Sequence, residues 1–238
     1  MERIHKIIEA FDLFESVIDD AFNLSTPDDI LIRSYFTIVE ILKELTGTGR
    51  FATKFSEFFY VRYVKKYLET NLEKLSFIEE RTIGGNSLRF IGIYKEKKII
   101  LSSDISIKSA GISERPDIFV GIEKENGIIH PLAIFEIKLH QEPKQIAELI
   151  TRFLKWKDDF VNKFSNEELP YFVWLYLRYE KYLKQDYEKE IIQFKTISKN
   201  NLSVVNEITE WNGNSYINNI RGEINSILLK IIEKIEQF

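Results

Sequence analysis

Two acidic residues and a lysine stand at the ends of two neighbouring apolar segments. Asp117 opens the segment DIFVGIE, and Glu136 and Lys138 close the segment IIHPLAIFEIKL. Between the two segments lies Asn126-Gly127, a dipeptide typical of tight β-hairpin turns. In a hairpin, the first strand begins beside the point where the second strand ends. We therefore expect Asp117 and Glu136 to meet at one open end of a sheet.

These residue types in this arrangement would support metal-dependent chemistry on a phosphate group. Two converging carboxylates repel each other unless a cation lies between them, and Mg²⁺ prefers oxygen ligands of this kind. A magnesium ion held by Asp117 and Glu136 would polarise a phosphate and acidify an attacking water molecule. Lys138 would orient that water and offset the charge that develops on the phosphate.

The segment that ends in Glu136 and Lys138 is expected to have two different faces, because side chains alternate along a strand. One face is apolar throughout, whereas the other begins apolar and becomes charged at its C-terminal end. The apolar face holds Ala133, Phe135, Ile137 and Leu139, and the other holds Leu132, Ile134, Glu136 and Lys138. Burying an unpaired charge is costly, so both charged residues need partners nearby.

The pattern Pro116-Asp117 followed by Glu136-Ile137-Lys138 at the end of an apolar strand resembles the PD-(D/E)xK nuclease superfamily. The resemblance covers roughly residues 50–180. It implies a restriction-endonuclease-like core in which Asp117, Glu136 and the Ile137 carbonyl hold a divalent metal. That metal is usually Mg²⁺, for which Mn²⁺ substitutes, and no small-molecule cofactor is implied. The resemblance assigns Lys138 to hydrolysis of a phosphodiester.

The resemblance also suggests further site residues on the helices around this strand. An additional acid on the preceding helix would be Glu57, and a glutamine on the following helix would be Gln145 or, as a weaker choice, Gln141. Asp104 is a rival carboxylate for the same metal. On the helix after the motif, Gln145 and three basic residues would contact nucleic acid. Those basic residues are Lys144, Arg152 and Lys155.

A structural explanation stands beside each of these assignments. Glu136 and Lys138 would form an ordinary surface pair where a strand leaves the core, and Asp117 would be a turn residue. The same Glu-x-Lys triplet also occurs in the charged stretch YKEKK and in HQEPK, so the triplet alone is not specific. Only the triplet at 136–138 ends an apolar strand. His130 and His140, which flank that strand, are more readily explained as structural residues.

Apolar periodicity and turn residues predict helices outside a set of strands. Helices are expected at 2–22, from the Ser25 or Thr26 cap to about 45, at 52–78, at 143–164 and from about 216 onward, where isoleucines form one seam. Strands are expected at 88–94, 98–107, 116–123, 128–139 and 171–179.

This order of elements predicts an α/β protein of the α+β, mixed-sheet kind, with a mostly antiparallel or mixed central sheet flanked by helices. Extra helices are expected at both ends. The expected regions are an N-terminal helical region at 1–48, a nuclease-like core at 49–200 and a C-terminal helical extension at 201–238, packed as one compact domain. The isoleucine seam is expected to pack within the molecule, or else to form a dimer interface.

Composition excludes several classes of site. The chain has 238 residues, no cysteine and three histidines, which excludes disulfides and thiolate zinc sites and disfavours an all-histidine metal site. The net charge of −4 means that a polyanion would have to bind a local basic patch. No apolar run reaches the length of a membrane helix, and the N-terminus lacks the features of a secretory signal, so we expect a cytoplasmic protein without a membrane partner.

The function that the resemblance implies is a magnesium-dependent endonuclease that hydrolyses DNA, of the type II restriction kind. The alternatives are a junction-resolving, repair or viral nuclease of the same superfamily, or a catalytically inactive DNA-binding relative. The expected partner is DNA, with double-stranded DNA preferred. Because cutting both strands of a duplex requires two sites, a homodimer is also expected.

Overall fold

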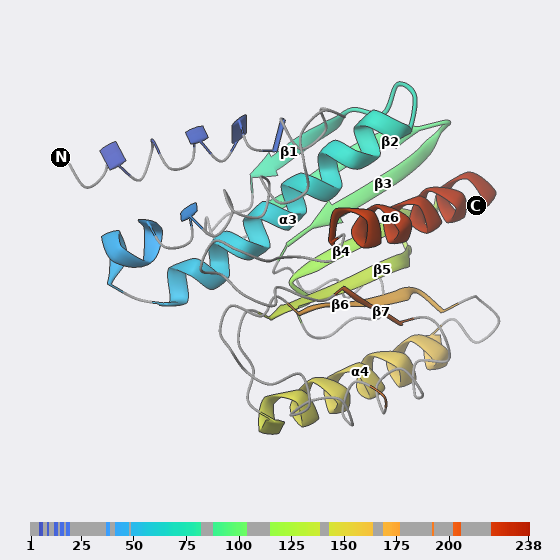
Figure 1. The fold of residues 1–238 in the computed structure, drawn as a ribbon. Helices are drawn as coiled ribbons and strands as arrows, with labels where there is room; N and C mark the ends of the chain where they lie inside the picture. Colours follow the sequence, from blue (N-terminus) through green and yellow to red (C-terminus); the bar gives the residue numbers. More distant parts are fainter. Residues whose placement is uncertain are drawn as a thin grey trace.

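A computed structural model gives the fold of the chain. It describes residues 41–47, 49–81, 88–103, 115–138, 143–163, 169–176, 202–205 and 220–238, together with isolated positions between 5 and 38 and residue 192. Within these ranges seven strands form one sheet in the order β1-β2-β3-β4-β5-β6-β7 (Figure 1). The strands are β1 (Phe77–Arg81), β2 (Leu88–Tyr94), β3 (Lys97–Ser102), β4 (Ile118–Glu123), β5 (Ile129–Lys138), β6 (Tyr171–Tyr176) and β7 (Leu202–Val205).

The sheet is mixed, which confirms the predicted α/β class. Strands β1 to β5 pair antiparallel with their neighbours, whereas β5, β6 and β7 run parallel. A tight turn suffices between antiparallel strands, but a parallel pair needs a long crossover. Helix α4 (Pro143–Lys163) provides that crossover between β5 and β6.

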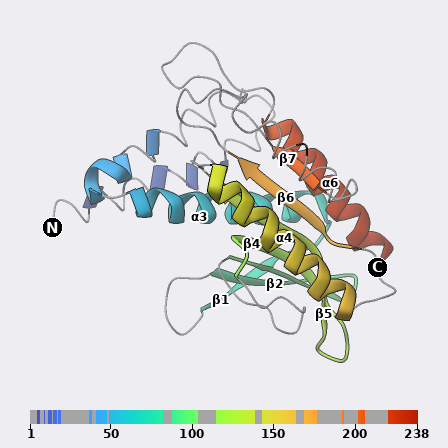
Figure 2. The ribbon, with the colours of Figure 1, turned by 90° about the horizontal axis from the view of Figure 1, so that it is seen from below.

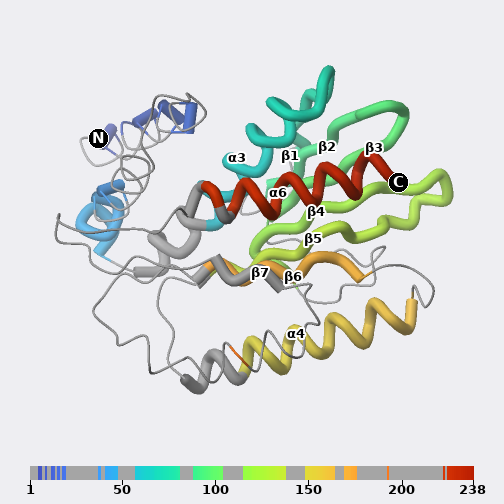
Figure 3. Tube along the Cα trace, turned by 45° about the vertical axis from the view of Figure 1, so that its right-hand side comes forward, coloured from blue at the N-terminus to red at the C-terminus, as the bar shows by residue number. Residues whose placement is uncertain are grey.

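Helices cover both faces of the sheet. Helices α3 (Gly49–Asn71) and α6 (Ile220–Gln237) lie on one face, and α4 lies on the other, below β5, β6 and β7 (Figures 1 and 3). The view from below shows α4 crossing in front of the sheet (Figure 2). Among the described helices, none combines the length and apolar character needed to cross a membrane.

Each face of the sheet has its own buried apolar layer. The layer under α3 and α6 forms one continuous cluster, and the layer under α4 is separate from it. Members of the first include Phe59, Leu68, Phe90, Ile118, Phe135, Ile137, Ile227, Leu228 and Ile231. Buried residues of the second include Ile134, Leu149, Phe153, Trp156, Phe160, Phe172 and Trp174. The described part of the isoleucine seam, from Ile224 to Ile235, therefore packs within the molecule, as predicted.

Polar contacts fix α6 at both of its ends. Near its start, the Tyr63 hydroxyl donates to Asn225 Oδ1 at 2.8 Å, and the Tyr67 hydroxyl donates to the Asn225 carbonyl at 3.3 Å. Burial raises the pKa of Tyr67. At the other end, Lys97 Nζ donates to the Ile235 carbonyl at 2.6 Å, where a cation also complements the helix dipole.

Strands β1 and β7 were not expected, and the helix predicted at 52–78 ends earlier, at Asn71. The apolar spacing of Leu68, Leu72 and Leu75 continues the helical period, but a turn follows Asn71, and Lys74 in that turn adopts φ +68°, which is not helical. β1 then forms by pairing with β2. β7 lies within the predicted C-terminal extension at 201–238 and belongs to the same sheet as the core strands.

The other predicted elements agree in type with the structure where it describes them. The helix at 143–164 and the β4–β5 hairpin are confirmed, and Gly127 turns that hairpin with φ +73°. The predicted helix at 2–22 and the one from the Ser25 or Thr26 cap to about 45 are helical at their described positions. Residues 104–107 and 177–179 of two predicted strands lie outside the described residues.

A β-bulge interrupts β5 and changes the predicted alternation of its side chains. Val120 pairs with Ala133, but the next residue, Gly121, pairs with Pro131, so Leu132 is the extra residue. Leu132 belongs to the same buried cluster as Ala133. The expectation that Leu132 shares the face of Glu136 is therefore wrong. Beyond the bulge the alternation holds through Ile137.

Gly121→Ala is expected to lower the free energy of unfolding by about 1–3 kcal/mol, because the strands approach closely at the bulge. An added Cβ would lie 2.9 Å from the His130 carbonyl oxygen and 2.7 Å from the Phe119 ring. Gly127→Ala is the comparison, since nothing lies within 4 Å of its added Cβ and only the positive φ opposes it. Urea unfolding followed by circular dichroism would measure both, and an unchanged stability of Gly121→Ala would contradict the close approach.

Candidate active site at the ends of β4 and β5

Asp117 and Glu136 come together at the end of the β4–β5 hairpin. The last described pair in the ladder is Ile118 with Phe135, so the preceding residue, Asp117, faces Glu136 in register. The backbone N–H of Ile137 donates to Asp117 Oδ2 at 2.6 Å. This bond links β5 to the residue just before β4, through a side chain in place of a backbone carbonyl. It fixes the Asp117 carboxylate beside β5.

The Ile137 carbonyl is directed toward the same side as its N–H. In an antiparallel ladder, the N–H and C=O groups of one residue point to the same neighbouring strand. Continuing the register places Pro116 opposite Ile137, and proline has no N–H with which to bond that carbonyl. At Pro116-Asp117, one backbone hydrogen bond of the ladder is thus replaced by the bond from the Ile137 N–H to the Asp117 carboxylate. Pro116 cannot donate a backbone hydrogen bond to the Ile137 carbonyl oxygen.

Glu136 lies on the α4 face of the sheet and is only 4% exposed. The guanidinium of Arg152, on α4, donates from Nη1 to Glu136 Oε2 at 3.1 Å. A buried carboxylate needs a compensating positive charge, and Arg152 provides it. Trp174, which is 1% exposed, is the register partner of Glu136 on β6. The charge of Glu136 is therefore bounded by an apolar neighbour on one side and a cation on another.

The packing of α4 determines where Arg152 lies. Leu149, Phe153 and Trp156 are buried at a helical spacing on the side of α4 that faces the sheet. The Phe153 ring meets the Phe172 ring of β6 edge to face, with 4.4 Å between centroids. Arg152 follows Leu149 by three residues, so it lies at the edge of this buried stripe, close enough to reach Glu136.

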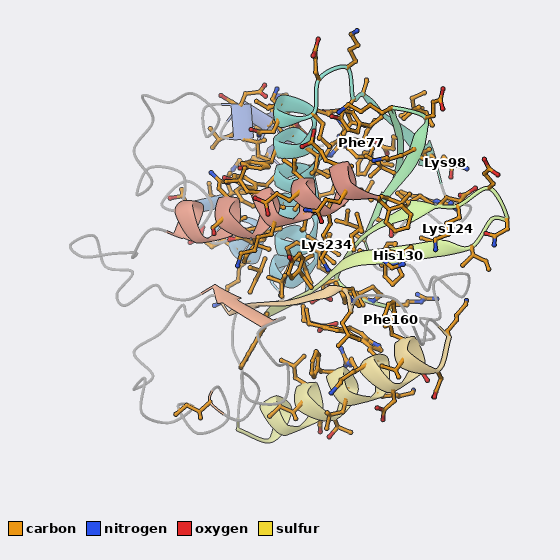
Figure 4. The ribbon with its side chains drawn as sticks, turned by 90° about the vertical axis from the view of Figure 1, so that its right-hand side faces the viewer. Phe77, Lys98, Lys124, His130, Phe160 and Lys234 are labelled. Atoms are coloured by element: carbon orange, nitrogen blue, oxygen red, sulfur yellow. The ribbon has the colours of Figure 1, made fainter. Side chains whose placement is uncertain are left out.

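His130 has aromatic neighbours at the other end of β5. Its ring lies 6.1 Å from the Phe160 ring of α4 and 4.8 Å from the Phe238 ring, measured between centroids. Figure 4 shows Phe160 on the α4 side of the sheet and His130 on β5 above it. These contacts agree with the structural role expected for His130. His140 lies outside the described residues.

The remaining predicted site residues differ in how far the structure describes them. Glu57 is 7% exposed on α3, which covers the sheet face opposite α4. Lys155 is exposed on α4. For Lys138, Lys144 and Gln145 only the backbone is described, at the end of β5 and in the first turn of α4. Asp104 and Gln141 lie outside the described residues.

The chemistry of this strand end suits a divalent metal. Oxygen donors from Asp117, Glu136 and the Ile137 carbonyl match the preference of Mg²⁺. Within the described ranges, no three His, Cys, Asp or Glu side chains gather closely enough to hold a metal ion. The two carboxylates and one carbonyl thus fit a site that leaves coordination positions for water and phosphate, without a third carboxylate such as Glu57.

The pairing of Arg152 with Glu136 is the feature that the sequence did not indicate. Arg152 was expected to contact nucleic acid, and its contact with a predicted metal ligand was missed. The available signal was its position three residues after Leu149 and four before Trp156, on the sheet-facing side of a predicted helix.

No protein-family model, curated protein or solved structure matches this chain.

Proposed function

We propose that this protein is a magnesium-dependent endonuclease with a restriction-endonuclease-like core. The observation that carries the proposal is the hydrogen bond from the Ile137 N–H to Asp117 Oδ2. It fixes Asp117 opposite Glu136 at the end of an otherwise apolar strand, the position that the superfamily pattern requires. The order of helix, antiparallel strands, crossover helix and parallel strand is consistent with the same core.

In this proposal each residue has a distinct task. Asp117, Glu136 and the Ile137 carbonyl would hold a divalent cation, which would polarise the phosphate and lower the pKa of water when bound. Lys138 orients the attacking water and stabilises charge on the phosphate oxygens. The water loses one proton and its oxygen bonds to phosphorus, the bond from phosphorus to one sugar oxygen breaks, and that oxygen takes up one proton. The products are a phosphate monoester and a hydroxyl.

The proposed substrate is double-stranded DNA, approached from the side of α4. Lys144, Gln145, Arg152 and Lys155 all belong to this helix, which begins five residues after the end of β5. Basic side chains would position the phosphate backbone, since such contacts give affinity without reading sequence. A homodimer would place one site on each strand, as cutting a duplex requires.

The purified protein is expected to nick or cut plasmid DNA in the presence of Mg²⁺ or Mn²⁺. Removing the metal with EDTA should stop cleavage, and restoring Mg²⁺ should recover it, because the cation is needed at Asp117 and Glu136 for charge stabilisation. Agarose gel electrophoresis of supercoiled, nicked and linear forms would measure the reaction. A protein that cleaves no DNA or RNA under these conditions would contradict the proposed activity.

A binding protein that kept the fold without catalysis is the second candidate. The observation that favours it is the ion pair in which Arg152 already compensates the charge of Glu136. Such a protein would bind duplex DNA equally well in EDTA and in Mg²⁺ and would cleave in neither. Gel-shift and cleavage assays on the same preparation would separate the two candidates.

A further inference from the structure

We propose that Arg152 competes with the divalent cation for Glu136, and that its release couples metal binding to nucleic-acid binding. This inference rests on the proposed function, because it takes Glu136 as a metal ligand. It assigns Arg152 a positioning role in the metal-free protein and a phosphate-binding role in the loaded one.

The first step concerns the metal-free protein. Glu136 is almost fully buried beside Trp174 and needs a cation when it is ionised. Arg152 supplies that cation at 3.1 Å, from a helix that packs firmly against the sheet through Phe153. The pair therefore holds the Glu136 carboxylate in place before any metal binds.

The second step concerns the arrival of a metal. Mg²⁺ binds oxygen ligands at about 2.0–2.1 Å. A divalent ion on the Glu136 carboxylate would thus lie close to the Arg152 guanidinium and repel it, because Glu136 is only 4% exposed and water screens this point little. The single negative charge of Glu136 is already neutralised by Arg152, so the divalent ion and the guanidinium compete for the same carboxylate.

The third step concerns the place to which Arg152 can move. Its side chain is 39% exposed, compared with 5% for its partner, so the guanidinium can turn toward solvent without opening the core. Lys155, which is exposed, lies three residues further along α4. A released guanidinium beside Lys155 presents planar donors suited to a phosphate group. Metal binding then strengthens DNA binding, and DNA strengthens metal binding by the same factor.

The first test measures Mn²⁺ affinity by isothermal titration calorimetry without DNA. Arg152→Met, which keeps the aliphatic length without the charge, should bind Mn²⁺ at least tenfold more tightly than the wild type. Arg152→Ala should do the same where it remains folded by circular dichroism. Lys230→Ala, which removes one exposed charge from α6 on the other face of the sheet, should leave the affinity unchanged. Glu136→Gln should lose binding.

The outcomes distinguish the two proposals. Equal Mn²⁺ affinity in the wild type and Arg152→Met, with binding lost in Glu136→Gln, would overturn the competition and leave the metal site standing. Unchanged Mn²⁺ binding in Glu136→Gln, or none in any variant including Arg152→Met, would overturn the metal site itself and the inference with it.

The second test measures the coupling in a Lys138→Ala background, where cleavage should not consume the DNA. Saturating Mn²⁺ is expected to raise duplex affinity severalfold when Arg152 is present, and by a clearly smaller factor in Lys138→Ala/Arg152→Met. Fluorescence anisotropy of a labelled duplex would give both affinities. An equal effect of Mn²⁺ in the two proteins would overturn the role of Arg152 in the coupling.

Discussion

Lys138→Ala is expected to lower the rate of magnesium-dependent DNA cleavage by about 10²- to 10³-fold, the usual effect of removing one group that stabilises transition-state charge. Lys138 ends β5 two residues after Glu136, and its ammonium is assigned to the attacking water and the phosphate. Metal affinity and thermal stability should change little, because the metal ligands remain. Single-turnover cleavage of plasmid DNA would measure the loss, with Lys230→Ala as the control that removes a distant positive charge.

Asp117→Asn should abolish cleavage in the same assay, for a different reason. Asparagine keeps an oxygen that can accept the Ile137 N–H, so the end of the hairpin should stay paired. It lacks the negative charge that the proposed metal site requires at this position. Asparagine is thus a better test than alanine, which would remove the acceptor as well. Robust cleavage by either Lys138→Ala or Asp117→Asn would overturn the assignment of the site.

Trp174→Ala is expected to lower the free energy of unfolding by about 3–5 kcal/mol, the range for truncating a buried aromatic residue. Trp174 is 1% exposed and is the register partner of Glu136, so its removal would leave a cavity beside the buried carboxylate. For a chain of this size the melting temperature should fall by about 10 °C. Differential scanning calorimetry would measure the change.

Ile78→Ala provides the matched control for this truncation. Ile78 is 74% exposed on β1, so its truncation should change stability by no more than about 0.5 kcal/mol. A loss for Trp174→Ala as small as that for Ile78→Ala would show that the layer between α4 and the sheet is not closely packed at this point.

Local patterns were sufficient where the elements depend on neighbouring residues. The β4–β5 hairpin follows from Asn126-Gly127 between two apolar segments, and the bond from the Gly127 N–H to the Lys124 carbonyl closes the turn as expected. The meeting of Asp117 with β5 follows from that hairpin alone. Helix α4 likewise follows from Pro143 at its first position and from its apolar period.

Patterns were insufficient where distant residues decide the structure. β1 carries Glu79, Glu80 and Arg81 on an edge strand, so little apolar alternation marks it, and pairing with β2 creates it. β7 spans only four residues. The bulge at Leu132 arises because Gly121 lets the strands approach, which no single segment reveals. The contact of Arg152 with Glu136 depends on how α4 docks against the sheet, which no local pattern specifies.

The distribution of contacts along the chain bears on the order in which the molecule assembles. Each of β1 to β5 pairs with the strand next to it in sequence. Helix α6 instead contacts α3 through Tyr63 and Asn225, which are 162 residues apart. Closing long loops costs chain entropy before contacts repay it, so local pairing is favoured early. We infer that the β4–β5 hairpin, with Asp117 beside Ile137, forms while the α3–α6 side of its core is still incomplete. On this inference, the bond between the Ile137 N–H and Asp117 forms before Arg152 of α4 pairs with Glu136.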